Sequence, residues 1–238
     1  MHWSEISANP NLPEVLRLRA SLLRKARRQP VENRIAYLCE MAKNKNVLDV
    51  GVVNHIAESA EDPDWLHGRL LAVASRCFGV DIAAEGIRKL LEKGYNVALC
   101  DITSEQGENI TDRFDLIICG ELIEHLGNPS RLFDAARRLL VPGGSLVLTT
   151  PNPFYLGRIF RHLFNASCEN VDHVTMLFAS GVAELADRAG LELKSYRGIY
   201  PEPVTKKRKL FLPVKWMVQA TTNNEAACES IVYECIRV

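Results

Sequence analysis

Apolar and polar residues alternate along this chain in two different rhythms. Short apolar runs, several of them closed by a glycine or an acid, indicate buried β-strands. Between them lie segments whose apolar residues recur at helical spacing. Strands that alternate with helices favour right-handed crossovers and a parallel sheet covered by helices on both faces. The predicted strands are 46–50, 76–81, 96–101, 114–119 and 144–150, and the helices predicted between them are 65–75, 84–93 and 126–140.

The two ends of the chain follow less regular patterns. Residues 1–45 predict an N-terminal helical extension, with apolar positions at helical spacing on both sides of Pro30. We see no internal repeat or low-complexity tract, so we expect one doubly wound, Rossmann-like α/β domain over residues 46–238. After the fifth strand, the pattern predicts a helix over 179–189, a strand over 191–200, an irregular stretch over 201–224 and a closing strand over 230–236.

Composition and charge narrow the class of protein. The chain has 238 residues, 47% of them hydrophobic, and its 29 basic residues balance its 29 acidic residues. This neutrality gives no general electrostatic case for a nucleic-acid partner, although the basic run 206–209 leaves one open. No apolar run approaches the roughly 20 residues of a membrane span, and no signal peptide is evident. Seven cysteines without a C-x-x-C pair indicate reduced thiols, so we expect a cytoplasmic protein.

Three acids follow or precede the turns at successive strand ends. Asp49 stands just before Gly51, where the backbone turns sharply and lets a ligand approach. Asp81 ends the second strand, where a carboxylate can accept hydrogen bonds from two ribose hydroxyls. Asp101 ends the third, within reach of the exocyclic amine of an adenine. Because ligands of such sheets bind beyond the carboxyl ends of the strands, these residues predict a nucleoside site.

A second cluster follows the fourth strand. Glu121, Glu124 and His125 are spaced i, i+3 and i+4, which brings them to one face if the segment is helical. Carboxylates and imidazoles suit a divalent cation such as Mg²⁺, Mn²⁺, Fe²⁺ or Zn²⁺, with a fourth ligand from Asp172-His173. Asn152, after the fifth strand, is a candidate substrate contact or a turn residue.

The order of these motifs resembles that of class I S-adenosylmethionine-dependent methyltransferases. The resemblance implies a seven-stranded, mostly parallel sheet with an antiparallel last strand, and S-adenosylmethionine as cofactor. By the same resemblance, the cofactor-binding residues are Asp49, Gly51, Asp81, Ile82, Asp101, Ile102, Gly120 and Glu121. The motifs are 47–51, 79–82, 100–102, 114–117 and 140–144.

The loop after Gly51 decides between cofactors and also departs from the family. A nicotinamide enzyme needs further glycines here to bring a pyrophosphate to a helix N-terminus. Gly51 is followed instead by Val52, Val53, Asn54 and His55. S-adenosylmethionine has no phosphate and does not require that arrangement. Val53 nevertheless replaces the second glycine usual in the family, and Asn54 and His55 are candidates to compensate by hydrogen bonding.

The Glu-x-x-Glu-His run resembles two methyltransferase groups, the ubiquinone-biosynthesis O-methyltransferases and the terminal 2′-O-methyltransferases of small RNAs. That likeness implies a cation bound by Glu121, Glu124, His125 and His173. Without a metal, Glu121 contacts the cofactor, His125 and Glu124 are the candidate catalytic residues with His125 as general base, and His173 contacts substrate or is structural.

We therefore expect a methyltransferase that modifies a hydroxyl of a small molecule or glycan in biosynthesis. The alternatives are a metal-dependent RNA 2′-O-methyltransferase and an inactive, methyltransferase-like binding protein, the latter suggested by the altered loop. The sequence identifies neither the acceptor nor the oligomeric state.

Overall fold

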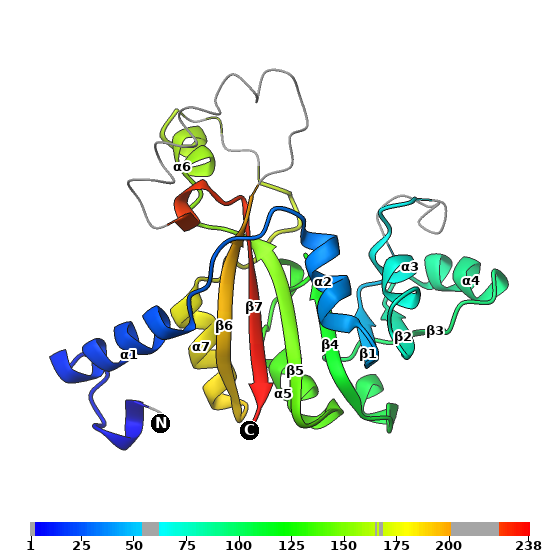
Figure 1. The fold of residues 1–238 in the computed structure, drawn as a ribbon, viewed down its shortest axis with the longest axis horizontal. Helices are drawn as coiled ribbons and strands as arrows, with labels where there is room; N and C mark the ends of the chain where they lie inside the picture. Colours follow the sequence, from blue (N-terminus) through cyan, green and yellow to red (C-terminus); the bar gives the residue numbers. More distant parts are fainter. Residues whose placement is uncertain (1–2, 54–61, 165, 167–168, 201–223) are drawn as a thin grey trace.

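The computed structural model describes residues 3–53, 62–164, 166, 169–200 and 224–238. Within these residues, seven strands form one sheet in the order β3-β2-β1-β4-β5-β7-β6 (Figure 1). Neighbouring strands pair in parallel except for β7, which is antiparallel to both β5 and β6. The predicted doubly wound α/β fold is confirmed. The strands are β1 (Asn46–Val50), β2 (Arg76–Asp81), β3 (Val97–Leu99), β4 (Phe114–Gly120), β5 (Leu140–Pro151), β6 (Leu191–Ile199) and β7 (Ser230–Arg237).

Alternate residues of the central strands point to opposite faces of the sheet, and helices cover both faces. In β4, Leu116 and Ile118 pack with α2 and α3, whereas Ile117 and Cys119 pack with α5 and α7. This two-sided burial explains the continuous apolar runs of the sequence. The helices are α1 (Pro13–Ala26), α2 (Arg34–Ala42), α3 (Leu66–Leu71), α4 (Ala84–Glu92), α5 (Ser130–Leu139), α6 (Leu156–Leu163) and α7 (Ala179–Arg188), with 3₁₀ turns η1 (Trp3–Glu5), η3 (Glu105–Asn109), η4 (Ile123–His125) and η5 (Asn224–Ala227).

Two predicted boundaries next to the site are wrong. The helix predicted over 126–140 begins only at Ser130, because Pro129 lacks an N–H group and is tolerated only at a helix start. The strand predicted over 144–150 already begins at Leu140, which is extended (φ −74°, ψ 147°) and pairs with Phe114. Residues 121–129 therefore form a loop, with one short 3₁₀ turn, at the carboxyl end of β4. Two further elements are shorter than predicted, α3 (predicted 65–75) and β3 (predicted 96–101).

The segment between α1 and α2 runs along the outer strand of the sheet. The backbone N–H groups of Arg28 and Val31 donate to the carbonyl oxygens of Tyr196 and Gly198 in β6, each at 2.9 Å. The bridges between this segment and β6 are parallel. The N-terminal extension is thus bonded to the last third of the chain, and α2 is led from β6 across to the carboxyl ends of the central strands (Figure 1).

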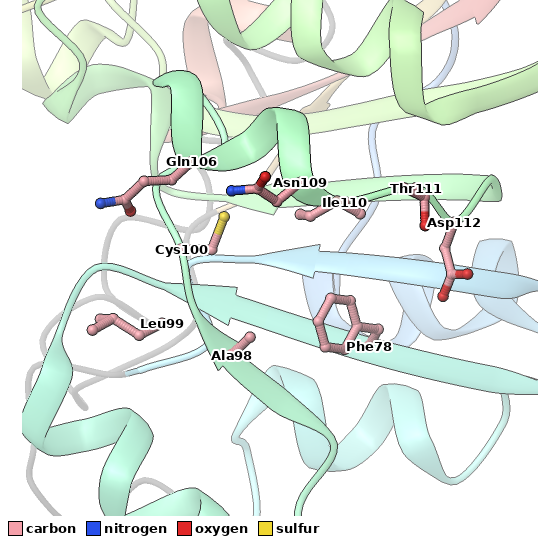
Figure 2. Close-up of a pocket in the computed structure, with 9 residues that line it drawn as sticks. All are labelled: Phe78, Ala98, Leu99, Cys100, Gln106, Asn109, Ile110, Thr111 and Asp112. Atoms are coloured by element: carbon pink, nitrogen blue, oxygen red, sulfur yellow. The ribbon is translucent and has the colours of Figure 1, made fainter.

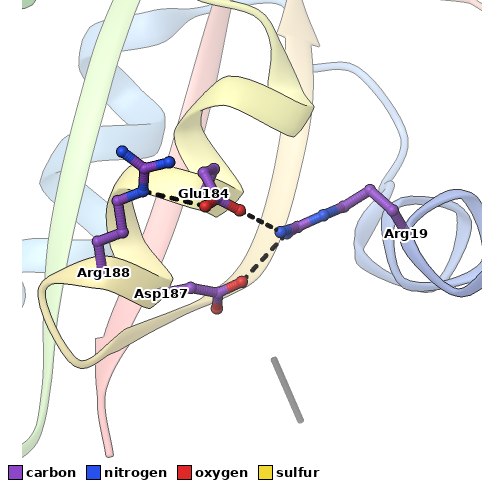
Figure 3. Close-up of polar contacts among 4 residues, drawn as sticks. All are labelled: Arg19, Glu184, Asp187 and Arg188. Carbon is purple, nitrogen blue, oxygen red and sulfur yellow. Dashed lines mark hydrogen bonds and ion pairs between the residues drawn. The ribbon is translucent and has the colours of Figure 1, made fainter. Parts of the chain in front are cut away.

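Helix α1 docks on α7 through a small ion network (Figure 3). The guanidinium of Arg19 contacts Glu184 at 2.7 Å and Asp187 at 3.1 Å. Arg188 contacts the same Glu184 at 3.0 Å from within α7. A second attachment therefore holds the N-terminal helix to the sheet domain. None of the helices in the described ranges is long and apolar enough to cross a bilayer.

Candidate functional site

The first turn at the carboxyl edge of the sheet follows β1. Gly51 has a φ of +85°, a left-handed conformation that favours glycine. The side chain of Val53 lies against Gly86 of α4, where an added Cβ atom would collide with it. The valine that replaces a glycine in this loop is therefore matched by a glycine on the facing helix. Asn54 and His55, the predicted compensating residues, lie outside the described residues.

Asp81 and Asp101 end or follow two neighbouring strands, so they lie at the same edge of the sheet. The carboxylate of Asp81 accepts hydrogen bonds from the backbone N–H groups of Val53 (2.8 Å) and Ala83 (2.9 Å). One oxygen of Asp101 accepts from the N–H (2.8 Å) and hydroxyl (2.7 Å) of Thr103. These donors fix both carboxylates, whose remaining lone pairs can still accept from a ligand.

The residues after the two acids differ in exposure. Ile82 is 74% exposed beside Asp81, so its side chain offers an apolar surface that a planar base can cover. Ile102 is buried in the core against η3. It can therefore offer a ligand only its backbone groups.

A cavity of about 520 Å³ opens beside β2 and β3 (Figure 2). Phe78 and Ala98 line its sheet side, and Asn109 and Ile110 face them from the connection to β4. The short η3 turn contributes Gln106 and Asn109 to the cavity lining. None of the predicted ligand-binding acids, Asp81 included, lines this cavity, so it is not part of the candidate site.

Arg34 of α2 reaches the end of β4. It was not among the site residues predicted from the sequence. Its Nη1 atom lies 3.4 Å from the hydroxyl of Thr149, and a Cβ on Gly120 would lie 3.1 Å from the same atom. The missing side chain of Gly120 thus makes room for a guanidinium. In the sequence, Arg34 looks like any arginine on the solvent-exposed face of an amphipathic helix, so no pattern marks it as a site residue.

Glu121 lies within the electrostatic influence of both Arg34 and Glu124, but it is not part of the group of close ligand atoms formed by the other predicted cation ligands. Its φ of +51° is unusual for a residue other than glycine, and such strain concentrates at functional sites. Its N–H donates to the carbonyl oxygen of Thr149 at 2.9 Å. Burial raises the pKa of Glu121, and the charge of Arg34 opposes this shift. The predicted common helical face is wrong, because only Ile123–His125 form a helical turn.

The predicted residues that do come together are Glu124, His125 and His173. One ligand atom from each lies within 4.8 Å of the others. Glu124 accepts a hydrogen bond from the hydroxyl of Thr150 at 2.9 Å. His125 Nδ1 lies 3.0 Å from a carboxylate oxygen of Asp172. The two imidazole rings meet edge to face, with centroids 4.8 Å apart.

The loop that carries His173 is held over Glu124 by backbone bonds. The N–H groups of Val174 (2.9 Å) and Thr175 (3.1 Å) donate to the carbonyl oxygen of Glu124. His173 Nδ1 is buried without a hydrogen-bond partner among the described residues. Burial, followed by the neighbouring His125, lowers the pKa of His173. An imidazole with one nitrogen that makes no hydrogen bond within the described residues therefore lies beside Glu124 and His125.

Asn152 is fully buried, and its side chain is used within the chain. Its Nδ2 atom donates to the carbonyl oxygens of Glu225 (2.7 Å) and Cys228 (2.8 Å). Its Oδ1 atom accepts from the N–H of Phe154 at 2.9 Å. This arrangement fits the turn role that the sequence left open and leaves little of Asn152 for a substrate.

Exposed apolar side chains lie on the segments before α6 and before α7, the second of which carries His173. Phe154, before α6, and Phe178, before α7, are about half exposed, and their ring centroids lie 6.4 Å apart. Val174 is 65% exposed on the loop between them. Further exposed apolar residues of α6 and its end are Ile159, Phe160, Leu163 and Phe164. The basic stretch 206–209 lies outside the described residues.

Glu124→Gln is expected to remove part of the pH dependence of stability. Burial, then the neighbouring Glu121, raises the pKa of Glu124 from 4.5 to about 7. Between these values the folded protein binds more protons than the unfolded chain, so the free energy of unfolding falls as the pH rises. From this group we expect a loss on the order of 2 kcal/mol between about pH 4.5 and pH 7.5.

Urea unfolding of both proteins at the two pH values measures this difference. Glu192→Gln, an exposed substitution on β6, serves as the matched control and is expected to follow the wild type. Parallel pH profiles of the wild type and Glu124→Gln would contradict a raised pKa at Glu124.

Comparisons with known proteins identify related sequences and folds. A family model described as "Methyltransferase domain" matches residues 22–196. The ubiquinone biosynthesis O-methyltransferase of Pseudomonas aeruginosa strain PAO1 is 29% identical over 197 residues, covering 76% of this chain and 79% of that protein. The enzyme of that name from Dechloromonas aromatica is 32% identical over 146 residues, covering 56% of this chain and 62% of the relative.

Two solved structures share the fold at low sequence identity. A putative methyltransferase from Bacillus halodurans superposes with a TM-score of 0.57 at 16% identity, covering 86% of this chain and 98% of that one. A complex between the Haloferax volcanii Trm112 methyltransferase activator and the putative methyltransferase contains a chain with a TM-score of 0.59 at 14% identity, covering 85% and 88%.

Proposed function

The chain belongs to the class I S-adenosylmethionine-dependent methyltransferases, whose domain model covers most of its length, and from this premise we propose that it methylates a hydroxyl group of a small molecule. The observation that carries the proposal is the joint placement of two sets of residues. Asp81 and Asp101 stand at one stretch of the sheet edge, and His125 with its partner Asp172 follows β4. In this proposal, a nucleoside site and a candidate base share the carboxyl edge of one sheet.

The cofactor site is proposed to run from β3 to β4. Asp81 would accept hydrogen bonds from the ribose hydroxyls, Asp101 from the adenine amine, and Ile82 would lie against the base. The amino-acid end of the cofactor is a zwitterion and needs one cation and one anion. Arg34 and Asp49 supply these charges from the face of the sheet covered by α2 and α3.

The chemistry follows from what the acceptor site must do. When bound, S-adenosylmethionine would supply a methyl group on a sulfonium sulfur, and its thioether would be the leaving group when an acceptor oxygen attacks the methyl carbon in line. His125 would take the hydroxyl proton at Nε2, because its Nδ1 faces Asp172 at 3.0 Å. The carboxylate of Asp172 orients the ring and stabilises the imidazolium that forms. The loop held over Glu124 helps to exclude water.

The acceptor class is suggested by the apolar rim. This rim consists of Phe154, before α6, and of Val174 and Phe178, on the segment that carries His173, and all three leave apolar surface exposed. A glycan would bring mostly hydroxyl groups to this rim, whereas an aromatic or otherwise apolar phenol would bury it. We therefore propose a small molecule with an apolar portion and favour it over a glycan.

A divalent cation at Glu124, His125 and His173 is the second candidate arrangement. Two imidazoles and one carboxylate fit Fe²⁺, Mn²⁺ or Zn²⁺, and the unpartnered Nδ1 of His173 is a spare ligand atom. A bound cation would act as a Lewis acid on the acceptor hydroxyl. A rise in melting temperature with Mn²⁺ or Zn²⁺, absent in His173→Ala, would support it, whereas activity that survives EDTA would exclude it.

The proposal is tested in two steps. Calorimetry with S-adenosylhomocysteine is expected to show binding in the micromolar range or tighter, and its absence would favour the inactive, binding-protein alternative. Release of S-adenosylhomocysteine from S-adenosylmethionine is then followed with catechols, alkylated phenols, sugars and short RNA as acceptors. Turnover with phenolic acceptors supports the proposal; turnover with RNA alone, falling steeply with salt, would replace it by the RNA alternative.

A further inference from the structure

We propose that His67 is a positioning residue that orients Asp49 toward the ammonium group of the bound cofactor. The inference rests on the proposed function and adds to it a residue that the sequence motifs do not contain. His67 belongs to α3, and Asp49 precedes the turn at Gly51 by two residues.

The two side chains form a buried pair beneath that turn. His67 Nδ1 lies 3.0 Å from Oδ2 of Asp49. His67 is fully buried, and Asp49 is only 2% exposed. Since a carboxylate only accepts, Nδ1 carries the proton and donates it to Asp49. The pair therefore fixes one carboxylate oxygen and sets the direction of the other.

The surroundings of the pair are otherwise apolar. The cluster under α2 and α3 contains Leu38, Leu70 and Ile118, among others. The sulfur of Cys77 is 3.8 Å from His67 Nδ1, and the ring of Trp65 is 5.3 Å away between centroids. His67 Nε2 has no hydrogen-bond partner among the described residues.

A purely structural role explains this arrangement poorly. A buried polar pair is weak evidence for stability, because well-packed apolar residues of similar volume are often as stable or more so. The unpartnered Nε2 adds a further cost. The chain nevertheless leaves Gly79 without a side chain at a point where a Cβ would lie 2.8 Å from His67 Cε1. The same space is also filled by Val52 and Val97, so the glycine lets the imidazole pack closely beside β2.

The location of the pair selects the end of the cofactor that it serves. Leu66, the neighbour of His67, lies with Arg34 against the end of β4 at Gly120. The pair and Arg34 are therefore on the same face of the sheet, whereas Asp81 and Asp101 lie toward its β3 edge. A carboxylate and a guanidinium on one face suit the ammonium and carboxylate groups of an amino acid.

The test compares two ligands that differ only at this end. S-Adenosylhomocysteine carries the amino-acid group, and 5′-methylthioadenosine lacks it. For His67→Phe we expect the Kd of S-adenosylhomocysteine to rise about tenfold or more, and that of 5′-methylthioadenosine to change less than about twofold. His67→Asn, whose side-chain amide can replace the Nδ1–H donor, is expected to bind S-adenosylhomocysteine within about threefold of the wild type.

A double-mutant cycle shows whether His67 acts through Asp49. In an Asp49→Asn background, His67→Phe is expected to cause no further loss of S-adenosylhomocysteine binding, whereas independent effects would multiply. Equal losses for both ligands, or a His67→Phe variant that binds like the wild type, would overturn the inference alone. If His67→Phe does not fold, His67→Gln, which moves the donor away from Asp49, is compared with the same two ligands. A wild type that binds neither ligand would overturn the proposed function, and this inference with it.

Discussion

Asp81→Ala is expected to weaken the binding of S-adenosylhomocysteine by about 100-fold. The carboxylate would accept from two ribose hydroxyls, and hydrogen bonds to a charged group contribute about 1.5–3 kcal/mol each. The same carboxylate accepts from the N–H of Val53 at 2.8 Å, so its loss also releases the loop after β1. Isothermal titration calorimetry of the wild type and the variant measures the change.

Asp112→Ala is the matched control for this substitution. Asp112 precedes β4 at the opposite end of the sheet and is an exposed partner of Arg76 at 2.9 Å. We expect its removal to leave the Kd within about twofold, because exposed ion pairs contribute little. An Asp81→Ala variant that folds and binds with the wild-type Kd would remove the nucleoside site from this edge of the sheet.

His125→Ala is expected to lower kcat by about 10²–10³ with the best acceptor of the panel, while the Kd of S-adenosylhomocysteine changes less than about twofold. We expect kcat to change and cofactor binding to be kept, because His125 pairs with Asp172 at 3.0 Å and lies next to His173, in the group assigned to the acceptor. Steady-state release of S-adenosylhomocysteine and calorimetry give the two values.

His162→Ala provides the control for a general effect of removing an imidazole. His162 lies on α6, half exposed, and its described contact is with Glu169. It is expected to keep kcat within about twofold. Asp172→Asn should lower kcat in the direction of His125→Ala, since it removes the charge that orients the ring. If His125→Ala retained the wild-type kcat, the base would have to be sought elsewhere.

The sequence predicted the strands well because both faces of the sheet are covered. Buried parallel strands must be apolar on both sides, so β2 and β4 appear as short apolar runs that end close to their observed limits. The positions of Asp81 and Asp101 followed from the same pattern, because an acid directly after such a run lies at the carboxyl edge.

What the sequence did not predict depends on backbone detail and on distant contacts. Helical spacing placed Glu121 on one helical face with Glu124 and His125, but Glu121 has a left-handed backbone and precedes the short turn Ile123–His125, so it does not join their group of ligand atoms. Arg34 and His67 each belong to a helix, and neither forms part of a sequence motif. An isolated arginine or histidine of this kind cannot be recognised as a site residue from the sequence. Their positions arise from the packing of α2 and α3 on the sheet.

Removal of residues before Arg34 would uncover the outer edge of β6. The carbonyl oxygens of Tyr196 and Gly198 would lose the N–H groups that now bind them, and the N–H of Tyr200 would lose the carbonyl oxygen of Val31. An exposed row of unpaired backbone groups recruits strands from other molecules. A shortened chain that kept every residue of the sheet is therefore expected to aggregate edge to edge, so a soluble fragment for crystallisation must retain the segment before α2.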